Sequence, residues 1–379
     1  MSAISSQTNL YQAHEQWMSR PDDERFTSLI ELNDHFQYQR DHSRAGVVSS
    51  RSLRLEPVNS HGQGRALSVI GPNGAAVAPT HHAFNQLCQL AEAPAGYLRT
   101  LPAALACDNV NYGLQFKRDI EEVGVLLYKN GGAPMLRAAT GPNYGRIWNA
   151  EITQALVNRF GDGVTGDWCV PGEFGKALDQ VTKENTTLFG GDRDMFVFLA
   201  DEKHRIEVPN RRTMMNGTAL NGSMARGFFV WNSEVGSCTF GVATFLFDYA
   251  CANRIIWNVS GFQEFKLRHT KAAPDRFVEQ LQPALIAYAN SSAQGITQGI
   301  AAARNARLGD KLDDFLATRF GKQLVAPMKA VHELEEQRPI ETLWDVATAA
   351  TAYARGIGYQ DARVDIERKA GKVLELAAA

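Results

Sequence analysis

The sequence predicts an α+β fold, with a twisted, mainly antiparallel sheet, helices packed on it and a helical C-terminal region. The sheet is predicted by the run RDMFVFLAD (193–201) and by the block 227–257. Both concentrate β-branched and aromatic residues as no other part of the chain does, which is typical of buried strands. The helical region is predicted by apolar residues that recur at helical spacing after Pro274.

Three regions follow from these patterns. A chain of 379 residues is long enough for one large domain or two ordinary ones. We expect an N-terminal helical arm over 1–45, an α+β core domain over 46–275 and a C-terminal helical region over 276–379. In the first region, Asp22 is the expected cap of a helix that carries Phe26. Its many charges and few core residues predict a peripheral arm or a partner-binding element.

Strand and turn signals open the core domain. The segments 52–58 and 66–71 carry alternating or continuous apolar residues, and Pro72-Asn73-Gly74 marks a turn after them. The clearest hairpin covers 124–140, where Asn130-Gly131-Gly132 separates two apolar runs. We therefore expect antiparallel strand pairs in the first half of the core.

Helix signals alternate with these strands. Thr80 is the expected N-cap of one helix, and Pro102 begins a short one that runs through Leu105. The segment 147–161 is amphipathic and ends at Gly161, a residue type that commonly closes helices. These helices are expected to pack on the sheet.

Composition narrows the class of protein. Hydrophobic residues make up 44% and charged residues 21%, and the formal net charge of -2 excludes a globally basic nucleic-acid binder. No apolar stretch reaches the roughly 20 residues that span a bilayer, and the first residues lack the pattern of a secretory signal. We expect no membrane partner and a cytoplasmic location. The scattered, odd set of cysteines also suits reduced thiols: Cys88, Cys107, Cys169, Cys238 and Cys251.

One stretch departs from the acidic balance of the chain. Between Lys203 and Arg276 there are ten basic and five acidic residues, a surplus of five positive charges, so the remainder carries a net charge of -7. Such an asymmetry is what a polyanion-binding face needs, because each neutralised phosphate releases counterions. The alternative is a solvated sheet edge whose charges prevent aggregation.

Aromatic residues alternate with these charges, and exposed rings beside Lys or Arg can stack single-stranded bases. Because successive strand residues face opposite ways, we expect most of these rings to lie in the core. One face can serve both roles, either Trp231 with Arg226, or Lys266 and Arg268 opposite Phe265 and Leu267. The predicted nucleic-acid-binding residues are Lys203, Arg205, Arg211, Arg212, Arg226, Trp231, Arg254, Trp257, Lys266, Arg268 and His269.

Signals for metal or catalytic chemistry are sparse. His269 follows an arginine and suits a phosphate ligand or a general base, but no carboxylate or second histidine stands near it. His81 and His82 are adjacent, so they do not form a helical metal pair. Asp192 and Asp194 could hold Mg²⁺ as in nucleases, or cap the loop and pair with arginines. We predict no catalytic residue, no metal and no cofactor.

Several ordered blocks carry a resemblance to a family. They are GRIWNAEITQALVNRFGDG, RDMFVFLADE, ARGFFVWNSEVGS, TFGVATFLFDYACANRIIW and KLRHT. In this order they resemble the plasmid- and phage-associated family catalogued as domain of unknown function 932, over roughly residues 45–375. The resemblance implies DNA metabolism of mobile elements. A β-rich centre followed by a helix is also similar, at the level of fold, to phage single-strand annealing proteins, which form rings around DNA.

These observations lead to three functional hypotheses. The first is a non-enzymatic, single-stranded DNA-binding protein of mobile elements that acts in recombination or strand annealing, as a homo-oligomer. The second is an interaction protein that inhibits a host defence or regulatory factor, through its acidic surface and N-terminal arm. The third is a metal-dependent nuclease that uses Asp192 and Asp194.

Overall fold

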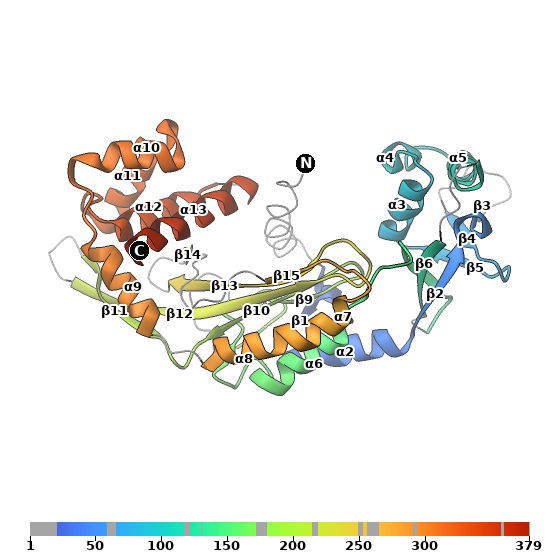
Figure 1. Ribbon diagram of the computed structural model, residues 1–379, viewed down its shortest axis with the longest axis horizontal. Helices are drawn as coiled ribbons and strands as arrows, with labels where there is room; N and C mark the ends of the chain where they lie inside the picture. Colours follow the sequence, from blue (N-terminus) through green and yellow to red (C-terminus); the bar gives the residue numbers. More distant parts are fainter. Residues whose placement is uncertain are drawn as a thin grey trace.

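The computed structural model describes residues 21–58, 66–116, 122–129, 131–171, 180–213, 219–248, 253–255, 265–290, 294–357 and 360–378. Figure 1 shows a curved molecule with a large sheet across its middle. A smaller sheet with its own helices lies at one end, and the C-terminal helices lie at the other. The predicted α+β class, with helices at the C-terminus, is confirmed.

The large sheet has nine strands, and all its pairs are antiparallel. Its main path runs β1-β9-β10-β12-β13-β14, while β8 pairs with β10, β11 with β12 and β15 with β13. The strands are β1 (Arg25–Phe26), β8 (Trp168–Cys169), β9 (Leu188–Gly190), β10 (Met195–Asp201), β11 (Ile206–Thr213), β12 (Ala219–Asn232), β13 (Phe240–Asp248), β14 (Asn253–Ile255) and β15 (Phe265–Leu267). The run predicted at 193–201 is therefore the buried strand β10.

Helices cover one face of this sheet, as Figure 1 shows below the strands. They are α2 (Leu29–Asp41), α6 (Asn149–Phe160), α7 (Ala273–Arg276) and α8 (Gln282–Asn290). Their apolar sides share one core with the even-numbered residues of β12, such as Phe228 and Val230. Helix α6 ends at Gly161, with φ 74°, as the sequence predicts.

The N-terminal helix differs from its prediction. Helix α2 begins after Ser28, whose hydroxyl accepts the Glu31 N–H, rather than at Asp22. Leu29, Leu32 and Phe36 are fully buried against the sheet. The part of the predicted peripheral arm that the structure describes from α2 onward therefore belongs to the core. Three apolar residues on one helical face are enough for this, despite the charge of the segment.

The smaller sheet has the order β2-β6-β7-β5-β4-β3. Its pairs are antiparallel except β5 with β7, which is parallel. The strands are β2 (Ser43–Ser49), β3 (Arg54–Pro57), β4 (Leu67–Ile70), β5 (Ala76–Pro79), β6 (Glu122–Tyr128) and β7 (Met135–Thr140). The helices α3 (His81–Leu90), α4 (Ala95–Leu98) and α5 (Ala103–Phe116) accompany it.

Several predictions in this half are confirmed. The predicted hairpin over 124–140 forms as β6 with β7, and the strand segments predicted at 52–58 and 66–71 pair antiparallel as β3 with β4. The hydroxyl of Thr80 caps α3 by accepting the Ala83 N–H at 3.1 Å. Helix α5 is much longer than the predicted segment that ends at Leu105, since the apolar residues that bury its inner face continue to Leu114.

The C-terminal region is helical, as predicted. It contains α9 (Gln294–Asn305), α10 (Leu312–Phe320), α11 (Lys322–Glu336), α12 (Leu343–Arg355) and α13 (Gln360–Ala378). These helices surround the buried α12 and share a core with Ile206, Met224 and Leu246 of the large sheet. They are thus packed on one end of the sheet. Among the described helices, none is long and apolar enough to cross a bilayer.

Candidate functional site

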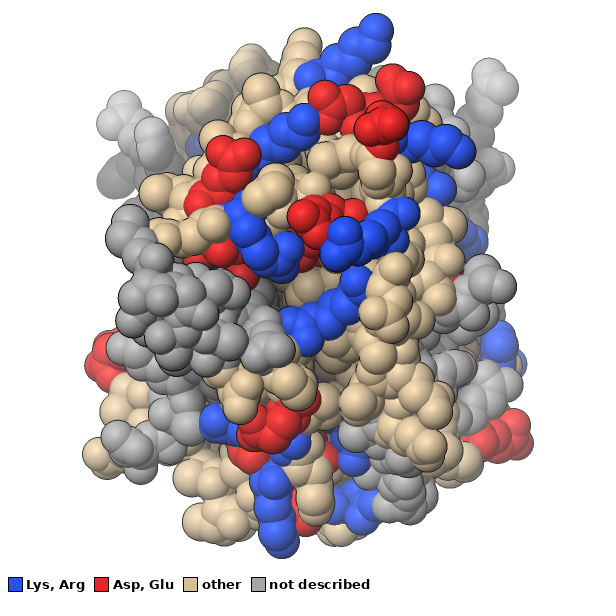
Figure 2. All heavy atoms as spheres, turned by 90° about the vertical axis from the view of Figure 1, so that its left-hand side faces the viewer, with Lys and Arg blue, Asp and Glu red and all other residues tan. Residues whose placement is uncertain are grey.

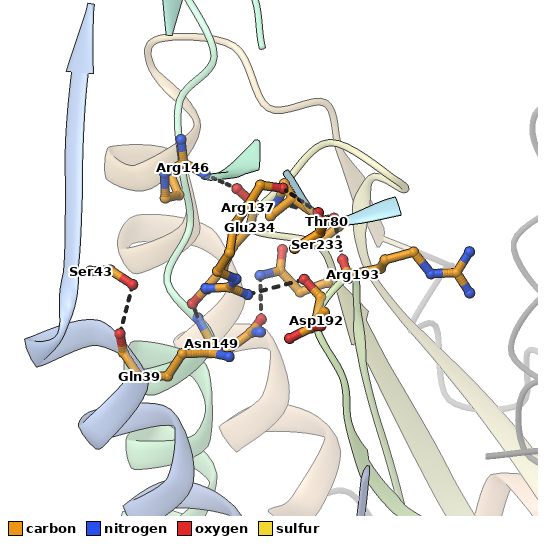
Figure 3. Close-up of polar contacts among 12 residues, drawn as sticks. Gln39, Ser43, Thr80, Arg137, Arg146, Asn149, Asp192, Arg193, Ser233 and Glu234 are labelled. Atoms are coloured by element: carbon orange, nitrogen blue, oxygen red, sulfur yellow. Dashed lines mark hydrogen bonds and ion pairs between the residues drawn. The ribbon is translucent and has the colours of Figure 1, made fainter. Parts of the chain in front are cut away.

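The turn Asn232–Ser237, between β12 and β13, is the polar centre of the junction between the two sheets (Figure 3). The Ser233 hydroxyl donates to the Arg193 carbonyl at 2.6 Å and accepts the N–H groups of Val235 and Ser237. The Tyr144 hydroxyl donates to the Ser233 carbonyl at 2.6 Å. The turn is therefore held by backbone and side chains from distant parts of the chain.

Glu234 forms a buried ion pair at this turn. Its carboxylate accepts Arg137 Nη1 at 3.0 Å and the Asn149 N–H at 2.8 Å, and both charged side chains are almost fully buried. Arg137 also donates to the Asp192 carbonyl at 3.2 Å, and the Arg146 guanidinium donates to the Glu234 carbonyl. The ion pair joins β7 of the smaller sheet to the turn after β12 of the larger one. Removing one partner would leave a buried, uncompensated charge.

Helix α3 holds the same turn from the side of the smaller sheet. Gln86 Nε2 donates to the Val235 carbonyl at 2.7 Å, and His82 Nε2 lies 3.1 Å from the same oxygen. Burial lowers the pKa of His82, so the neutral imidazole donates this bond. Asn232 completes the arrangement by donating to the Ile147 carbonyl and to Asn149 Oδ1. The two sheets are therefore fixed to each other at this turn.

Beside the turn lies a cleft of about 440 Å³. Asp192, Arg193 and His81 are exposed in it, whereas Asp194 is buried. The Glu24 carboxylate packs on Gly191, where an added Cβ would lie 2.7 Å from its oxygens. The cleft is lined by Pro21, Glu24, Pro79, Thr80, His81, His82, Met135, Asp192, Arg193 and Asp194.

The cleft brings together residues that the sequence places in separate motifs. His81 and His82 come from the start of α3, and Asp192 and Asp194 precede β10. Within the described part of the chain, no three His, Cys, Asp or Glu side chains are grouped so that they could hold a metal ion. Asp192 is exposed whereas Asp194 is buried, so the two carboxylates do not face one shared ligand site. The structure therefore supplies a cleft for the nuclease hypothesis, but the described residues do not form a set of metal ligands in it.

The predicted DNA-binding residues fall into two groups at different ends of β13. Lys266 lies opposite Gly241, and Arg254 lies opposite Phe247, six residues farther along the strand. At 3.3 Å per residue this is about 20 Å. Arg211 and Arg212 are on β11 and Arg254 is on β14, but their side chains, like all of Trp257, lie outside the described residues.

Lys203 and Arg205 are close to carboxylates. Lys203 Nζ lies 2.9 Å from Asp167 Oδ1, and Arg205 Nη2 lies 2.5 Å from Glu202 Oε2. The hydrogen bond from Lys203 lowers the pKa of Asp167. The Lys203 side chain is nevertheless largely exposed, whereas that of Arg205 is half-buried. A phosphate at Lys203 would compete with Asp167 in solvent, where such pairs are weak.

Arg226 and Trp231, two of the predicted DNA-binding residues, are buried in the structure. The Arg226 guanidinium is buried and bonded through Nε and Nη2 to Asp201 Oδ2, at 3.0 and 2.9 Å, and it lies over the Trp168 ring. Trp231 is 1% exposed and packs on the other face of the sheet, beside Phe229. Residues five apart on a strand point to opposite faces, so the two cannot form one binding face. Neither is placed to contact DNA in this structure.

Gly241 explains how Trp231 lies on the sheet. A Cβ at Gly241 would stand 2.1 Å from Trp231 Cζ2, so the indole occupies the space above the glycine. Lys266 Nζ is 6.0 Å from the centre of the same ring, and its side chain is half-buried. The sequence suggested a second binding face with Lys266 and Arg268 as its cations, and of these two Arg268 is the exposed one.

His269 is also built into the structure. Its Nδ1 lies 3.0 Å from the Gly145 carbonyl, to which it donates, and its ring stacks on Tyr144 with centroids 4.8 Å apart. Burial lowers the pKa of His269 to about 4. The imidazole is therefore neutral at pH 7 and brings no positive charge to a phosphate. A lone histidine in sequence does not reveal this contact, which spans 124 residues.

The end of the molecule formed by the C-terminal helices carries no single sign of charge. Figure 2 shows Lys and Arg side chains interleaved with Asp and Glu on this face. Among the exposed pairs of the C-terminal region, Arg307 lies 3.4 Å from Glu341. Asp345, the partner of Arg338 at 2.5 Å, is buried. This face does not extend the basic character of the stretch 203–276.

We found no protein-family model, curated protein or solved structure that matches this chain. The resemblance to the plasmid- and phage-associated family thus stays a prediction based on the sequence blocks.

Proposed function

We propose that the protein binds single-stranded DNA in recombination or strand annealing of mobile elements, acting in the cytoplasm as a homo-oligomer. The observation that supports this is the surplus of five positive charges between residues 203 and 276, within an otherwise acidic chain. This stretch contains the strands β11–β15 of one sheet and helix α7. Three of its cations, Lys203, Arg205 and Arg226, pair with carboxylates that lie outside the stretch. Binding of a polyanion to this stretch would release counterions, which favours the complex.

The exposed members of the stretch narrow the proposed contact. Arg268, Lys271 and Arg276 are exposed and follow one another along the segment in which β15 leads into α7. Within this segment Asp275 is the only acidic residue. Three cations within nine residues suit contacts to successive phosphates of one strand. These residues replace the buried Arg226 and Trp231 in the proposal.

Charge reversal tests this contact. The double variant Arg268→Glu/Lys271→Glu should bind a labelled single-stranded oligonucleotide more weakly, to a similar degree for different sequences. If both residues contact phosphate, the slope of log affinity against log salt should flatten by about 1.4, at roughly 0.7 per contact. Fluorescence anisotropy at several salt concentrations measures both quantities.

The matched control is Lys311→Glu/Lys372→Glu, which reverses two exposed lysines of the C-terminal region. It changes the net charge equally but leaves the stretch 203–276 intact. An equal loss of affinity in the two double variants would mean that general charge, rather than this surface, governs binding. Unchanged affinity in the Arg268 and Lys271 variant would remove the assignment.

A further inference from the structure

A second pocket lies beside the turn Asn232–Ser237. Its volume is about 420 Å³, within the range of about 300–1,000 Å³ that is typical of small-molecule sites. Three segments that lie far apart in the sequence form it, namely α3, the end of β7 with the loop after it, and the turn. Its walls include Gln86, Gln89, Thr140, Gly141, Tyr144 and Gly236.

Hydrogen bonds between these segments fix the walls of the pocket. Gln86 of α3 joins the other two, because its Nε2 donates to the Val235 carbonyl at 2.7 Å and its Oε1 accepts the Ala139 N–H at 2.9 Å. The Tyr144 hydroxyl donates to the Ser233 carbonyl at 2.6 Å, which fastens the loop after β7 to the same turn. A pocket that is held in this way loses little conformational entropy when a ligand enters.

The lining of the pocket is polar but uncharged, as far as the described residues form it. The Gln89 amide is exposed and has no hydrogen-bond partner within the described part of the chain, so it is available both to donate and to accept. Tyr144 adds an aromatic ring, and Leu90 adds an aliphatic side chain. This lining suits a neutral, planar molecule, because amides pair with the edges of nucleobases and aromatic rings stack on their faces.

The pocket is joined to the proposed phosphate contact. The ring of Tyr144 stacks on His269, with centroids 4.8 Å apart, and the Gly145 N–H donates to the His269 carbonyl at 3.0 Å. Arg268 is the residue before His269, and Lys271 follows two residues after it. A strand whose phosphates contact these two cations would therefore pass the wall of the pocket that Tyr144 forms.

We propose that this pocket binds a nucleobase, which the bound single strand supplies. The site rests on the proposed DNA binding and extends it from the phosphates to the bases. A paired base cannot enter, because the partner strand occupies its hydrogen-bonding edge, so the pocket favours single strands over a duplex. A free nucleoside offers the same chemistry, and the two sources can be separated by experiment.

Abasic oligonucleotides separate the bases from the phosphates. In fluorescence anisotropy, wild-type protein should bind a mixed-sequence single strand about fivefold or more tightly than an abasic strand of equal length, the effect expected of one bound base. Gln89→Ala should lower the affinity for the mixed strand toward that for the abasic strand. The dependence of binding on salt should not change, because the phosphate contacts remain.

The matched control is Asn85→Ala, because Asn85 is an exposed amide of the same helix that does not line the pocket. It should leave the affinity for both strands unchanged. Equal affinities of wild type for the mixed and abasic strands, or equal effects of Gln89→Ala and Asn85→Ala, would overturn the base pocket and leave the proposed phosphate contact standing.

Free nucleosides test the pocket even if no oligonucleotide binds. Saturation-transfer NMR with millimolar deoxyadenosine or thymidine should detect binding to wild type and its loss in Gly141→Leu. No atom of the described residues lies within 4 Å of a Cβ built at Gly141, so this side chain has room to fill the pocket. Gly96→Leu, at an equally open position on α4, is the control, and melting curves establish that both variants fold.

The results with nucleosides and oligonucleotides together identify the source of the base. Binding of nucleosides without binding of any oligonucleotide would support the nucleobase pocket but overturn the strand as its source, together with the proposed function. A nucleoside signal that persists in Gly141→Leu, or no signal with wild type, would overturn the pocket.

Discussion

At the scale of single residues, the buried pair of Arg137 and Glu234 fixes how the two sheets meet. We predict that Glu234→Leu lowers the free energy of unfolding by about 3–5 kcal/mol, because it leaves the Arg137 charge buried without its carboxylate. Urea titration measures this loss. In the double variant Arg137→Met/Glu234→Leu neither buried charge of this pair remains, so much of the stability should return. A double variant no more stable than the single one would contradict this reasoning.

His269 should make stability depend on pH. Its pKa falls from the ordinary histidine value of 6.5 to about 4 in the folded protein, mainly through burial. As pH falls below 6.5, the unfolded chain binds the proton first, so stability is complete above pH 6.5 and is lost toward pH 4. His269→Gln should remove a slope of up to about 1.4 kcal/mol per pH unit in this window. The control is the exposed His81→Gln, and equal pH profiles for His269→Gln and wild type would contradict the assignment.

At this scale the sequence predicts the chemistry of each residue type, but not which partner the residue meets in the fold. The alternation of strand residues already separates Arg226 from Trp231, since their numbers differ by an odd value. The partner of Arg226 could not be predicted in the same way. Asp201 lies 25 residues away on a neighbouring strand, and the strand register decides which acid faces the guanidinium. Buried ion pairs of this kind look like surface charge in a sequence.

At the scale of elements, the large sheet depends on glycines beneath aromatic rings. We predict that Gly241→Ala destabilises the protein by about 1–3 kcal/mol, because the new methyl group would overlap the Trp231 indole. Gly96→Ala on α4 is the control, since an added Cβ there meets nothing within 4 Å. Urea titration compares the two. Equal stability of the two variants would mean that the ring moves aside at no cost.

Local signals predicted elements well and their positions in the fold poorly. Thr80, Gly161 and the hairpin over 124–140 act through neighbouring residues, so the sequence pattern is sufficient to identify them. The burial of α2 depends on a partner surface formed by residues more than a hundred positions later. The role of the polar turn at 232–237 likewise depends on β7, α3 and α6. These elements bring Arg137, Gln86 and Asn149 to the turn.

At the scale of the whole molecule, the stretch 203–276 and the smaller sheet with its helices lie on different parts of the fold. Figure 1 places α5 beside the smaller sheet, at the end opposite the C-terminal helices. In the proposed homo-oligomer, association of copies would bring several basic stretches into one particle, and linked sites raise the apparent affinity for a long strand.

The most direct test of the account is binding of wild-type protein to labelled single- and double-stranded oligonucleotides of equal length, by fluorescence anisotropy at two salt concentrations. The account predicts binding that prefers the single strand and weakens steeply as salt rises, because released counterions drive it. Absence of binding at low salt, or a preference for the duplex, would contradict the proposed function.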